Sequence, residues 1–419
     1  TLTLEDCLRI GIDNNLSLEG KRKEIQKSKY GVSENRSKLL PQITVIAGYN
    51  NNFDPPVSVT DGSSYGVPYN ITKTLQHTAN AGLEMQMPLF NQTLYTSMSI
   101  AKVMEEISRL SYGKAREDII MQISKMYYLG QVTAEQIVLI KANITRLEEL
   151  RDITQAFFDN GMSMEVDLKR VNINLENLKV QYDNAQAMMK QQLNMLKYIM
   201  DYPAEKEFVL TPVNTDSITT VALTGLSENI YELQLSQSQV QLAEKQKKII
   251  SNGYIPSLSL TGSWRYAAYT DKGYHWFHSG PSNHWFRSYG LGLTLRIPIF
   301  DGLDKTYKIK KAMIDIENSK LAWENARKSL QTQYLNAVND LMNNQRNFKK
   351  QKDNYLLAED VYTVTSDRYR EGIASMTEVL QDEMQMSEAQ NNYISAHYNY
   401  RITNLMLLKL TGQIESLVK

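Results

Sequence analysis

The residues that could ligate a metal ion gather in one segment of the chain. His275, His278 and His284 lie close together in the sequence, with Asp271 as the nearest carboxylate. No further carboxylate stands at ligand spacing, and a structural zinc site needs about four ligands. An exposed loop rich in aromatic residues accounts for the same histidines. We therefore predict a loop here, with no metal site and no cofactor.

The sulfur-bearing side chains have two interpretations. Met188, Met189, Met195 and Met200 could supply soft ligands in a copper exporter, but methionine also fills irregular gaps between helices, and we prefer that interpretation. The only cysteine, Cys7, excludes an intrachain disulfide and a zinc site built from several cysteines. Its apolar helical setting predicts a packed thiol. No Ser/His/Asp, P-loop or GxGxxG arrangement has suitable surroundings, so we predict no enzyme.

Composition excludes two further classes of protein. The 419 residues include 46 Lys and Arg against 46 Asp and Glu, so the net charge is zero and a nucleic-acid partner is not expected. No run of about 18 uncharged apolar residues predicts a transmembrane helix. The chain begins at Thr1 and shows no charged-then-apolar leader, as expected if a signal segment has been removed.

Two long intervals without proline predict very long helices. Proline is absent from 89–202 and from 299–419, and each interval holds just three glycines. We predict one helical hairpin from an outgoing helix over 92–159 and a return helix over 164–202. A second hairpin follows from helices over 302–369 and 376–411. Each outgoing helix would be about 100 Å long.

The two halves of the sequence repeat each other. Pro41 and Pro256 stand in similar segments, as do Pro88 and Pro298, and the glycines at positions 161 and 372 share nearly the same offset. On that offset Asp167 falls on Glu378. We therefore predict structural repeats over 1–210 and 211–419, with a further helix at about 15–39 in the first and 227–252 in the second.

Four short segments alternate apolar and polar residues with a period of two. They predict strands at about 42–50, 79–88, 257–267 and 289–298, separated within each half by a long loop. A small sheet with one face on a core would give the same pattern. So would tilted strands that cross a bilayer, which need about nine to eleven residues. Four strands cannot close a barrel with a lumen, so two copies would give eight strands and three would give twelve.

The ordered set of motifs resembles the TolC-like outer-membrane efflux family, the bacterial channel-tunnels. Leu-Pro at 40–41 and Ile-Pro at 255–256 enter the strands, while Met-Pro-Leu-Phe-Asn at 87–91 and Ile-Pro-Ile-Phe-Asp-Gly at 297–302 leave them. The most specific stretch is Tyr-Arg-Glu-Gly-Ile-Ala-Ser-Met-Thr-Glu-Val-Leu at 369–380. The resemblance covers nearly the whole chain.

The resemblance implies an α+β membrane protein that acts as a homotrimer. Each chain would give four strands to one twelve-stranded barrel in the lipid of the bacterial outer membrane, and its coiled-coil-like hairpins would form a tunnel through the periplasm. The channel would be the exit duct of a tripartite efflux or type I secretion system. Its partners would be a periplasmic adaptor (membrane fusion) protein and an inner-membrane pump of the RND or ABC type.

The resemblance also implies roles for particular residues. Acidic side chains line the constriction at the helical tips in this family, and the matching positions are Glu378 and Asp167, with Tyr369 as an aromatic partner. The next lining position holds Gln381, and the adjacent Asp382 points about 100° away around a helix. Where the family has an arginine in its closing network, this chain has alanine at position 374. The residues of the tips would dock the adaptor: Asn160, Gly161, Met162, Ser163, Glu371, Gly372, Ile373, Ala374 and Ser375. The prolines at 41, 88, 256 and 298 would mark junctions between strands and helices.

A periplasmic adaptor or scaffold is the alternative function, because such proteins also combine helical hairpins with a β domain. Adaptors usually carry one hairpin and Gly-rich lipoyl-like strands, whereas this sequence predicts two hairpins and two pairs of strands. A protein that stays in the aqueous fraction without detergent would favour the adaptor.

Overall fold

The computed structural model describes residues 1–73, 75–212, 225–270 and 285–418. The chain divides into two compact units. The hairpin unit comprises 1–25, 107–238 and 320–419, and the sheet unit comprises 26–106 and 239–319. The predicted histidine loop lies outside the described residues, so its prediction stays untested.

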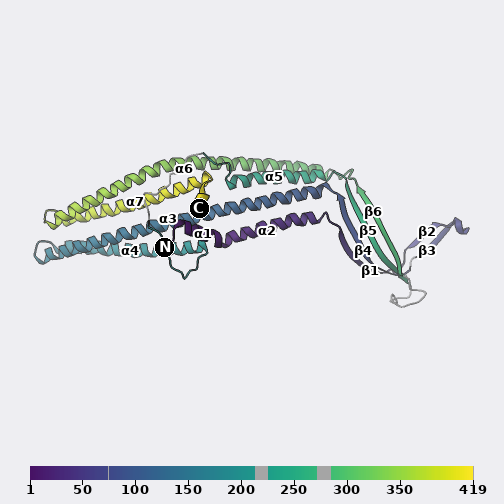
Figure 1. The fold of residues 1–419 in the computed structure, drawn as a ribbon, viewed down its shortest axis with the longest axis horizontal. Coiled ribbons are helices and arrows are strands. Elements are labelled where there is room, and N and C mark those ends of the chain that lie inside the picture. The colour runs from purple at the N-terminus through teal and green to yellow at the C-terminus, as the bar shows by residue number, and fades with distance from the viewer. Residues whose placement is uncertain (74, 213–224, 271–284, 419) are drawn as a thin grey trace. The chain divides into compact units, whose positions relative to one another are not determined.

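Seven α-helices and two short 3₁₀ helices occur in the described part of the chain. In order they are α1 (Leu4–Asn14), α2 (Leu16–Ser37), η1 (Ser63–Tyr65), α3 (Gln92–Asp159), α4 (Glu165–Met200), α5 (Tyr231–Asn252), α6 (Asp304–Arg370), α7 (Met376–Leu410) and η2 (Ile414–Val418). Helices α3 and α4 form one hairpin and α6 and α7 form another (Figure 1). Their ends differ from the predicted ends by at most two residues, which is the ordinary scatter of helix boundaries.

The helix predicted over 15–39 is the second of two. A separate helix, α1, precedes it, and Asn15 divides them because its side-chain Oδ1 accepts the backbone N–H groups of Ser17 at 2.9 Å and Leu18 at 3.1 Å. This is the bonding of an N-cap, which starts a new helix. The helix predicted from 227 begins instead at Tyr231.

One apolar core of the hairpin unit lies where the two hairpins meet. Leu147 and Leu150 of α3 are buried against Val171 of α4, Tyr362 of α6 and Val379 of α7. The apolar seam of α3 thus packs on residues of α4, α6 and α7. None of the helices in the described ranges is both long enough and apolar enough to cross a membrane.

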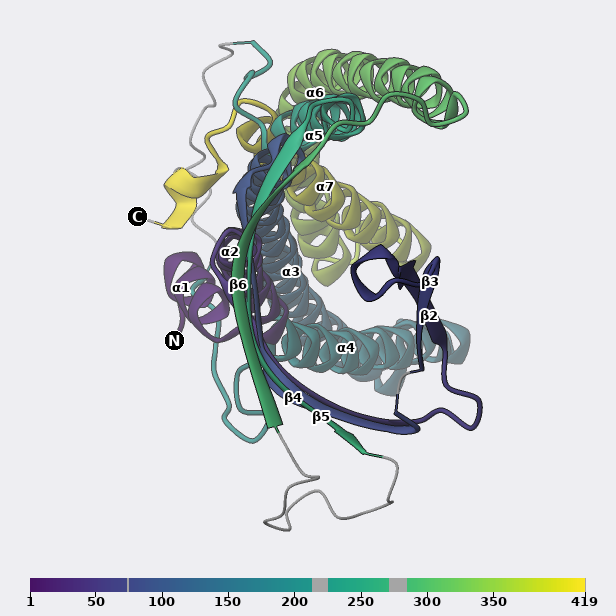
Figure 2. The ribbon, with the colours of Figure 1, turned by 90° about the vertical axis from the view of Figure 1, so that its right-hand side faces the viewer.

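The sheet unit contains one four-stranded antiparallel sheet. Its strands are β1 (Gln42–Asn51), β4 (His77–Phe90), β5 (Ser257–Thr270) and β6 (Trp285–Arg296), in the order β1-β4-β5-β6. The sheet is strongly curved (Figure 2). The central pairing joins β4 to β5, so strands from the two halves of the sequence lie side by side. Each of the four strands is connected to a helix at one end, and all four helices join the sheet at the same side.

Three details of the sheet unit differ from the prediction. The segment predicted as one long loop over 51–78 contains two further strands, β2 (Val57–Asp61) and β3 (Tyr69–Lys73), which pair only with each other. Pro88 lies inside β4, beside an irregularity in the pairing with β5, and not at its end. Strand β6 ends before Pro298.

The other two junction prolines stand where they were predicted. Pro41 directly precedes β1 and Pro256 directly precedes β5. Proline has no N–H to give to a strand pairing, so it suits a position just before a strand.

Both hairpins turn in the same way. Gly161 has a φ of +73° and Gly372 has a φ of +75°. After α6, the N–H of Ile373 donates to the carbonyl of Arg368 at 2.8 Å and the N–H of Gly372 to that of Tyr369 at 2.9 Å. Residues 157–162 repeat this bonding after α3. It is the helix-ending motif that requires a left-handed residue, usually glycine.

We predict that Gly372→Ala weakens the second turn, because a left-handed alanine costs about 1 kcal/mol or more. Amide hydrogen exchange at Ile373 should become roughly fivefold faster. Gly20→Ala is the matched control, because Gly20 lies inside α2 with open space around it and helix interiors favour alanine. Equal exchange at Ile373 in the Gly372→Ala variant and the wild type would contradict the prediction.

Candidate functional site

One face of the four-stranded sheet is apolar. Residues directly opposite each other in a strand pairing lie on the same face of the sheet. Successive residues along one strand point to opposite faces. One row across the sheet joins Val45, Leu83, Trp264 and Tyr289. The side chains of this face are largely exposed in the single chain; Tyr289, for example, is 76% exposed. An apolar face of this extent requires a cover of lipid or protein.

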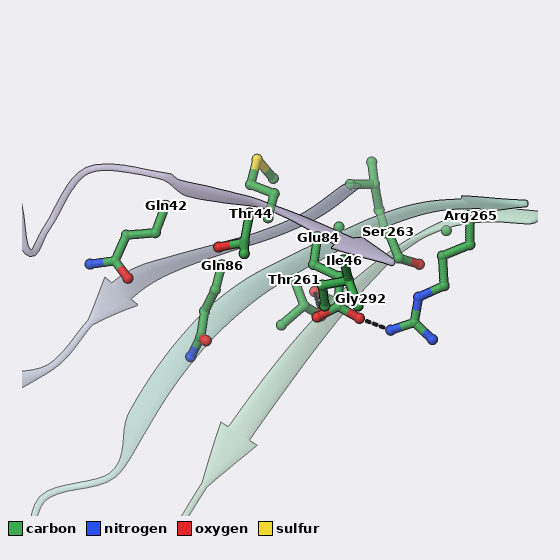
Figure 3. Close-up of a pocket in the computed structure, with 13 residues that line it drawn as sticks. Gln42, Thr44, Ile46, Glu84, Gln86, Thr261, Ser263, Arg265 and Gly292 are labelled. Atoms are coloured by element: carbon green, nitrogen blue, oxygen red, sulfur yellow. Dashed lines mark hydrogen bonds and ion pairs between the residues drawn. The ribbon is translucent and has the colours of Figure 1, made fainter. Parts of the chain in front are cut away.

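The opposite face of the sheet is polar and lines a hollow (Figure 3). One row joins Thr44, Glu84, Ser263 and Gly290, and the next row begins at Gln42. Small and uncharged polar groups dominate this wall. Such a surface suits contact with water and polar solutes rather than with hydrocarbon.

An ion pair joins the two central strands on this polar wall. The guanidinium of Arg265 contacts the carboxylate of Glu84, and the dashed line in Figure 3 marks the pair. Gly82 stands opposite Arg265 in the pairing, and a Cβ there would collide with the backbone of β5 and with the stem of Arg265. The glycine therefore leaves the space across which Arg265 reaches Glu84.

Both edges of the four-stranded sheet are open in the described chain. Strand β1 pairs only with β4, and β6 pairs only with β5. Each edge therefore presents a row of N–H and C=O groups that a further strand could take up.

At the first tip, α4 begins after Met164, which provides no side-chain cap. Asp167 accepts a hydrogen bond from Arg170 at 3.4 Å, and Arg170 also donates to the hydroxyl of Thr377 at 3.3 Å. Thr377 directly precedes Glu378. Arg170 thus joins Asp167 at the start of α4 to Thr377 at the start of α7.

At the second tip, Glu378 closes the first turn of α7. Its backbone N–H donates to the Ser375 hydroxyl at 3.3 Å, and its carboxylate accepts the Ser375 backbone N–H at 2.8 Å. This reciprocal pair is a capping box. The backbone hydrogen bond from Ser375 lowers the pKa of Glu378, with its hydroxyl as a further cause. Glu378 is consequently ionised at neutral pH and exposed at the end of the hairpin.

Tyr369 ties the second hairpin to the first. It is buried, its hydroxyl donates to the hydroxyl of Thr154 at 3.3 Å, and its ring lies 5.7 Å from that of Phe157. Arg370 donates to the carboxylate of Glu149 at 3.4 Å. The remaining tip residues, 160–163 and 371–375, are mainly exposed, so a partner could reach them.

Residue Asp382 is half-buried, one turn after Glu378 on α7, and its side chain makes no hydrogen bond or ion pair with any described residue. The neighbouring Glu383 was not anticipated from the sequence. It is 5% exposed, its Oε1 has no hydrogen-bond partner in the described structure, and burial raises its pKa. The nearby guanidinium of Arg146 partly offsets that effect. Residue type gave no signal for Glu383, because its burial arises from packing between helices.

The remaining reactive side chains have structural surroundings. Cys7 is fully buried, and burial raises its pKa to about 12, so it is a packed thiol as predicted. Met189 and Met200 contribute to the same core cluster, but Met188 and Met195 are about half exposed and do not fill a core in the single chain. No group of three potential metal ligands occurs in the described residues.

An amphipathic sheet and long helical hairpins in one chain define an α+β protein of the membrane-channel class. The model of the family described as outer membrane efflux protein matches residues 10–200 and 214–413, so the chain belongs to this family. Its members are channels of the outer membrane and not enzymes, and the chain is accordingly an outer-membrane efflux channel protein.

Individual relatives agree with this assignment. Outer membrane protein TolC of Vibrio cholerae serotype O1 is 21% identical over 396 residues, which cover 91% of this chain and 84% of that protein. The probable efflux pump outer membrane protein TtgC of Pseudomonas putida is 23% identical over 382 residues, or 85% of this chain and 75% of TtgC.

The fold also matches solved channels. The CusC structure superimposes with a TM-score of 0.81 at 15% identity and covers 97% of this chain and 91% of CusC. The outer-membrane channel OprN gives a TM-score of 0.80 at 14% identity and covers 98% of this chain and 90% of OprN.

We predict that Glu383→Gln stabilises the protein at pH 8 by about 1 kcal/mol, since it removes a carboxylate that burial disfavours. A raised pKa means that the folded state binds the proton more tightly than the unfolded state. The wild type should therefore lose stability as pH rises from the ordinary glutamate pKa through the raised one, and the variant should not. Urea unfolding of detergent-solubilised protein at pH 4 and pH 8 measures this difference.

The exposed Glu388 on the same helix provides the control variant, Glu388→Gln, which should follow the wild type at both pH values. A Glu383→Gln variant with the pH dependence of the wild type would show that Glu383 is not the titrating group.

Proposed function

We propose that three copies of this chain form the passive outer-membrane exit duct of a tripartite efflux or type I secretion system. Substrates would pass from a periplasmic adaptor and an inner-membrane pump through a tunnel of helical hairpins and out through a shared barrel. The observation that carries the proposal is the amphipathic four-stranded sheet with two open edges. Family membership supports the channel over the periplasmic adaptor.

Hydrocarbon explains why copies must associate. An unpaired backbone N–H or C=O group in a bilayer costs several kcal/mol, so a sheet in lipid must close on itself. Neighbouring strands of the sheet run in opposite directions, and the sheet has four strands. Its two edge strands, β1 and β6, therefore run in opposite directions. The β6 edge of one copy is therefore antiparallel to the β1 edge of the next, and the alternation continues around a ring of any number of copies.

The number of copies follows from the function. Two copies would give eight strands, and side chains fill the interior of a barrel of that size. Three copies give twelve strands, with the polar wall of Glu84 and Ser263 on the inside and the apolar rows toward lipid. This arrangement leaves a lumen for polar solutes.

The helical tips supply the gate in this proposal. Three copies would bring three Glu378 and three Asp167 carboxylates into one ring, which favours cations and repels anions. Asp382, one turn above Glu378, would add to the same negative field. Tyr369 would hold the hairpins of each chain together while the copies separate at the tips. Rigid helix pairs that shift against each other are a common form of gating.

The partners would bind at the exposed turns. Residues 160–163 and 371–375 end the two hairpins, and backbone turns with few buried side chains leave their surface available to an adaptor. The pump, of the RND or ABC type, would supply the energy for transport.

The proposed pairing of β6 with β1 of the next copy predicts that cysteines placed on these two strands can link three chains covalently. Three double variants test the pairing: each combines Val45→Cys on β1 with one cysteine on β6, at Leu291, Leu293 or Leu295. Under mild oxidation, one of the three should form disulfides between chains. Gel electrophoresis should then show a product of three chains. Leu83→Cys with Leu293→Cys is the control, because β4 has strands on both sides. A dimer as the largest product of every edge pair would exclude the twelve-stranded barrel.

The gate predicts a change in conduction. Glu378→Gln together with Asp167→Asn should raise the single-channel conductance of reconstituted protein and weaken block by multivalent cations, because the ring loses its negative charge. Asp159→Asn, which removes one carboxylate at the end of α3, serves as a control for a loss of charge near the tip. Unchanged conductance and block in the double variant would eliminate these two residues as the constriction.

A further inference from the structure

The apolar face of the four-stranded sheet carries one charged side chain. Among the residues of β1, β4, β5 and β6 that share this face, Arg287 is the only Arg, Lys, Asp or Glu. It belongs to the row that joins Ala47, Ala81 and Tyr266. A cation on a surface that is otherwise apolar requires a physical reason, because it loses hydration when the surface is covered.

The position of Arg287 along β6 is at the loop end of the strand. Leu291, Leu293 and Leu295 follow it toward the helices and are 79%, 67% and 60% exposed. From Leu295 to Arg287 the strand runs about 27 Å at ~3.4 Å per residue. At a tilt of about 45° this is roughly 19 Å of height, against an apolar band of about 25 Å. Arg287 therefore lies near the loop-side boundary of the band and not at its centre.

Aromatic rings surround Arg287 on this face. Its guanidinium Cζ lies 5.8 Å from the centre of the Tyr289 ring, Tyr266 stands opposite it, and Trp285 lies two residues before it. Aromatic belts of this kind mark the boundary between hydrocarbon and headgroups in membrane barrels. Arg287 makes no ion pair with a carboxylate in the described residues, whereas Arg265 on the polar wall is paired with Glu84.

We infer that Arg287, flanked by Tyr266 and Tyr289, binds the phosphate of a lipid headgroup in the leaflet nearest the loops. The inference rests on the proposed function, because it requires the apolar face to lie against lipid. The guanidinium presents paired N–H donors that match phosphate oxygens, and the ring hydroxyls of the two tyrosines are further donors. The aromatic rings would lie beside the upper part of the acyl chains.

Phosphate is favoured over other anions by the surroundings of the cation. A protein carboxylate on the apolar face would itself lose hydration at the hydrocarbon boundary. The described strands place no carboxylate on this face. A lipid brings its phosphate to this depth already anchored by its acyl chains, so the ion pair forms without burying a second free ion. A soluble phosphate lacks that anchor and should compete poorly.

The test is native mass spectrometry of the full-length trimer in mild detergent with two lipids that share the same acyl chains. Dioleoyl phosphatidic acid carries an exposed phosphate, and dioleoyl phosphatidylcholine is zwitterionic. The wild type should prefer phosphatidic acid, and Arg287→Gln should reduce this preference about fivefold, the ratio that corresponds to roughly 1 kcal/mol per basic residue at a membrane surface. Arg287→Lys should retain part of the preference.

Arg296→Gln is the matched control, because Arg296 lies on the same strand but on the polar face. It should bind phosphatidic acid as the wild type does. Equal losses in the Arg287 and Arg296 variants, or no loss in either, would overturn the inference. Strong competition by inorganic phosphate would also overturn it, because the site would then not require a lipid.

A separate measurement distinguishes this outcome from failure of the proposed function. Leu293→Cys, labelled with a fluorophore and reconstituted with brominated lipids, should be quenched if the apolar face meets hydrocarbon. Cys7 is buried and should not be labelled. An unquenched label would contradict the proposed barrel. A quenched label with no effect of Arg287→Gln would remove only the lipid site.

Discussion

Backbone hydrogen bonding at the edges of one sheet is the constraint on which the rest of this protein depends. In water, an open strand edge is solvated, and four strands with a polar and an apolar face can exist as a single sheet. In hydrocarbon the same edge has no solvent to bond, and only another strand can satisfy it. In the proposed barrel, the open edges at β1 and β6 would therefore be satisfied by neighbouring copies of the chain.

Much of the fold could be predicted from the sequence because long-range order here follows simple local rules. The absence of proline and the turn glycine at position 161 set the limits of α3, and period-two alternation located β1 and β5. The strands β2 and β3 were missed because each is only five residues long, within a segment rich in turn-forming residues. The break between α1 and α2 depends on Asn15, whose capping role is one of several that asparagine plays in loops.

The role of a site residue could be predicted from the sequence where it depends on a turn of the backbone. It was harder to predict where it depends on packing between helices. Gly161 and Gly372 are required by left-handed backbone, which sequence spacing indicates directly. The capping box of Glu378 is a local pattern too, because Ser375 stands three residues before it. The burial of Glu383 could not be anticipated, because the helices that cover it are distant in sequence.

Every strand of the main sheet joins a helix at the same end of the sheet. This arrangement limits where the sequence can vary without affecting the helices. Strand β1 leaves the helical side and β4 returns to it, so β2 and β3 between them belong to the opposite rim. In the proposed arrangement, insertions or substitutions at that rim would alter what faces the surroundings of the cell and would leave the helical tips unchanged. Variation of the outer surface would thereby be separated from compatibility with the partners.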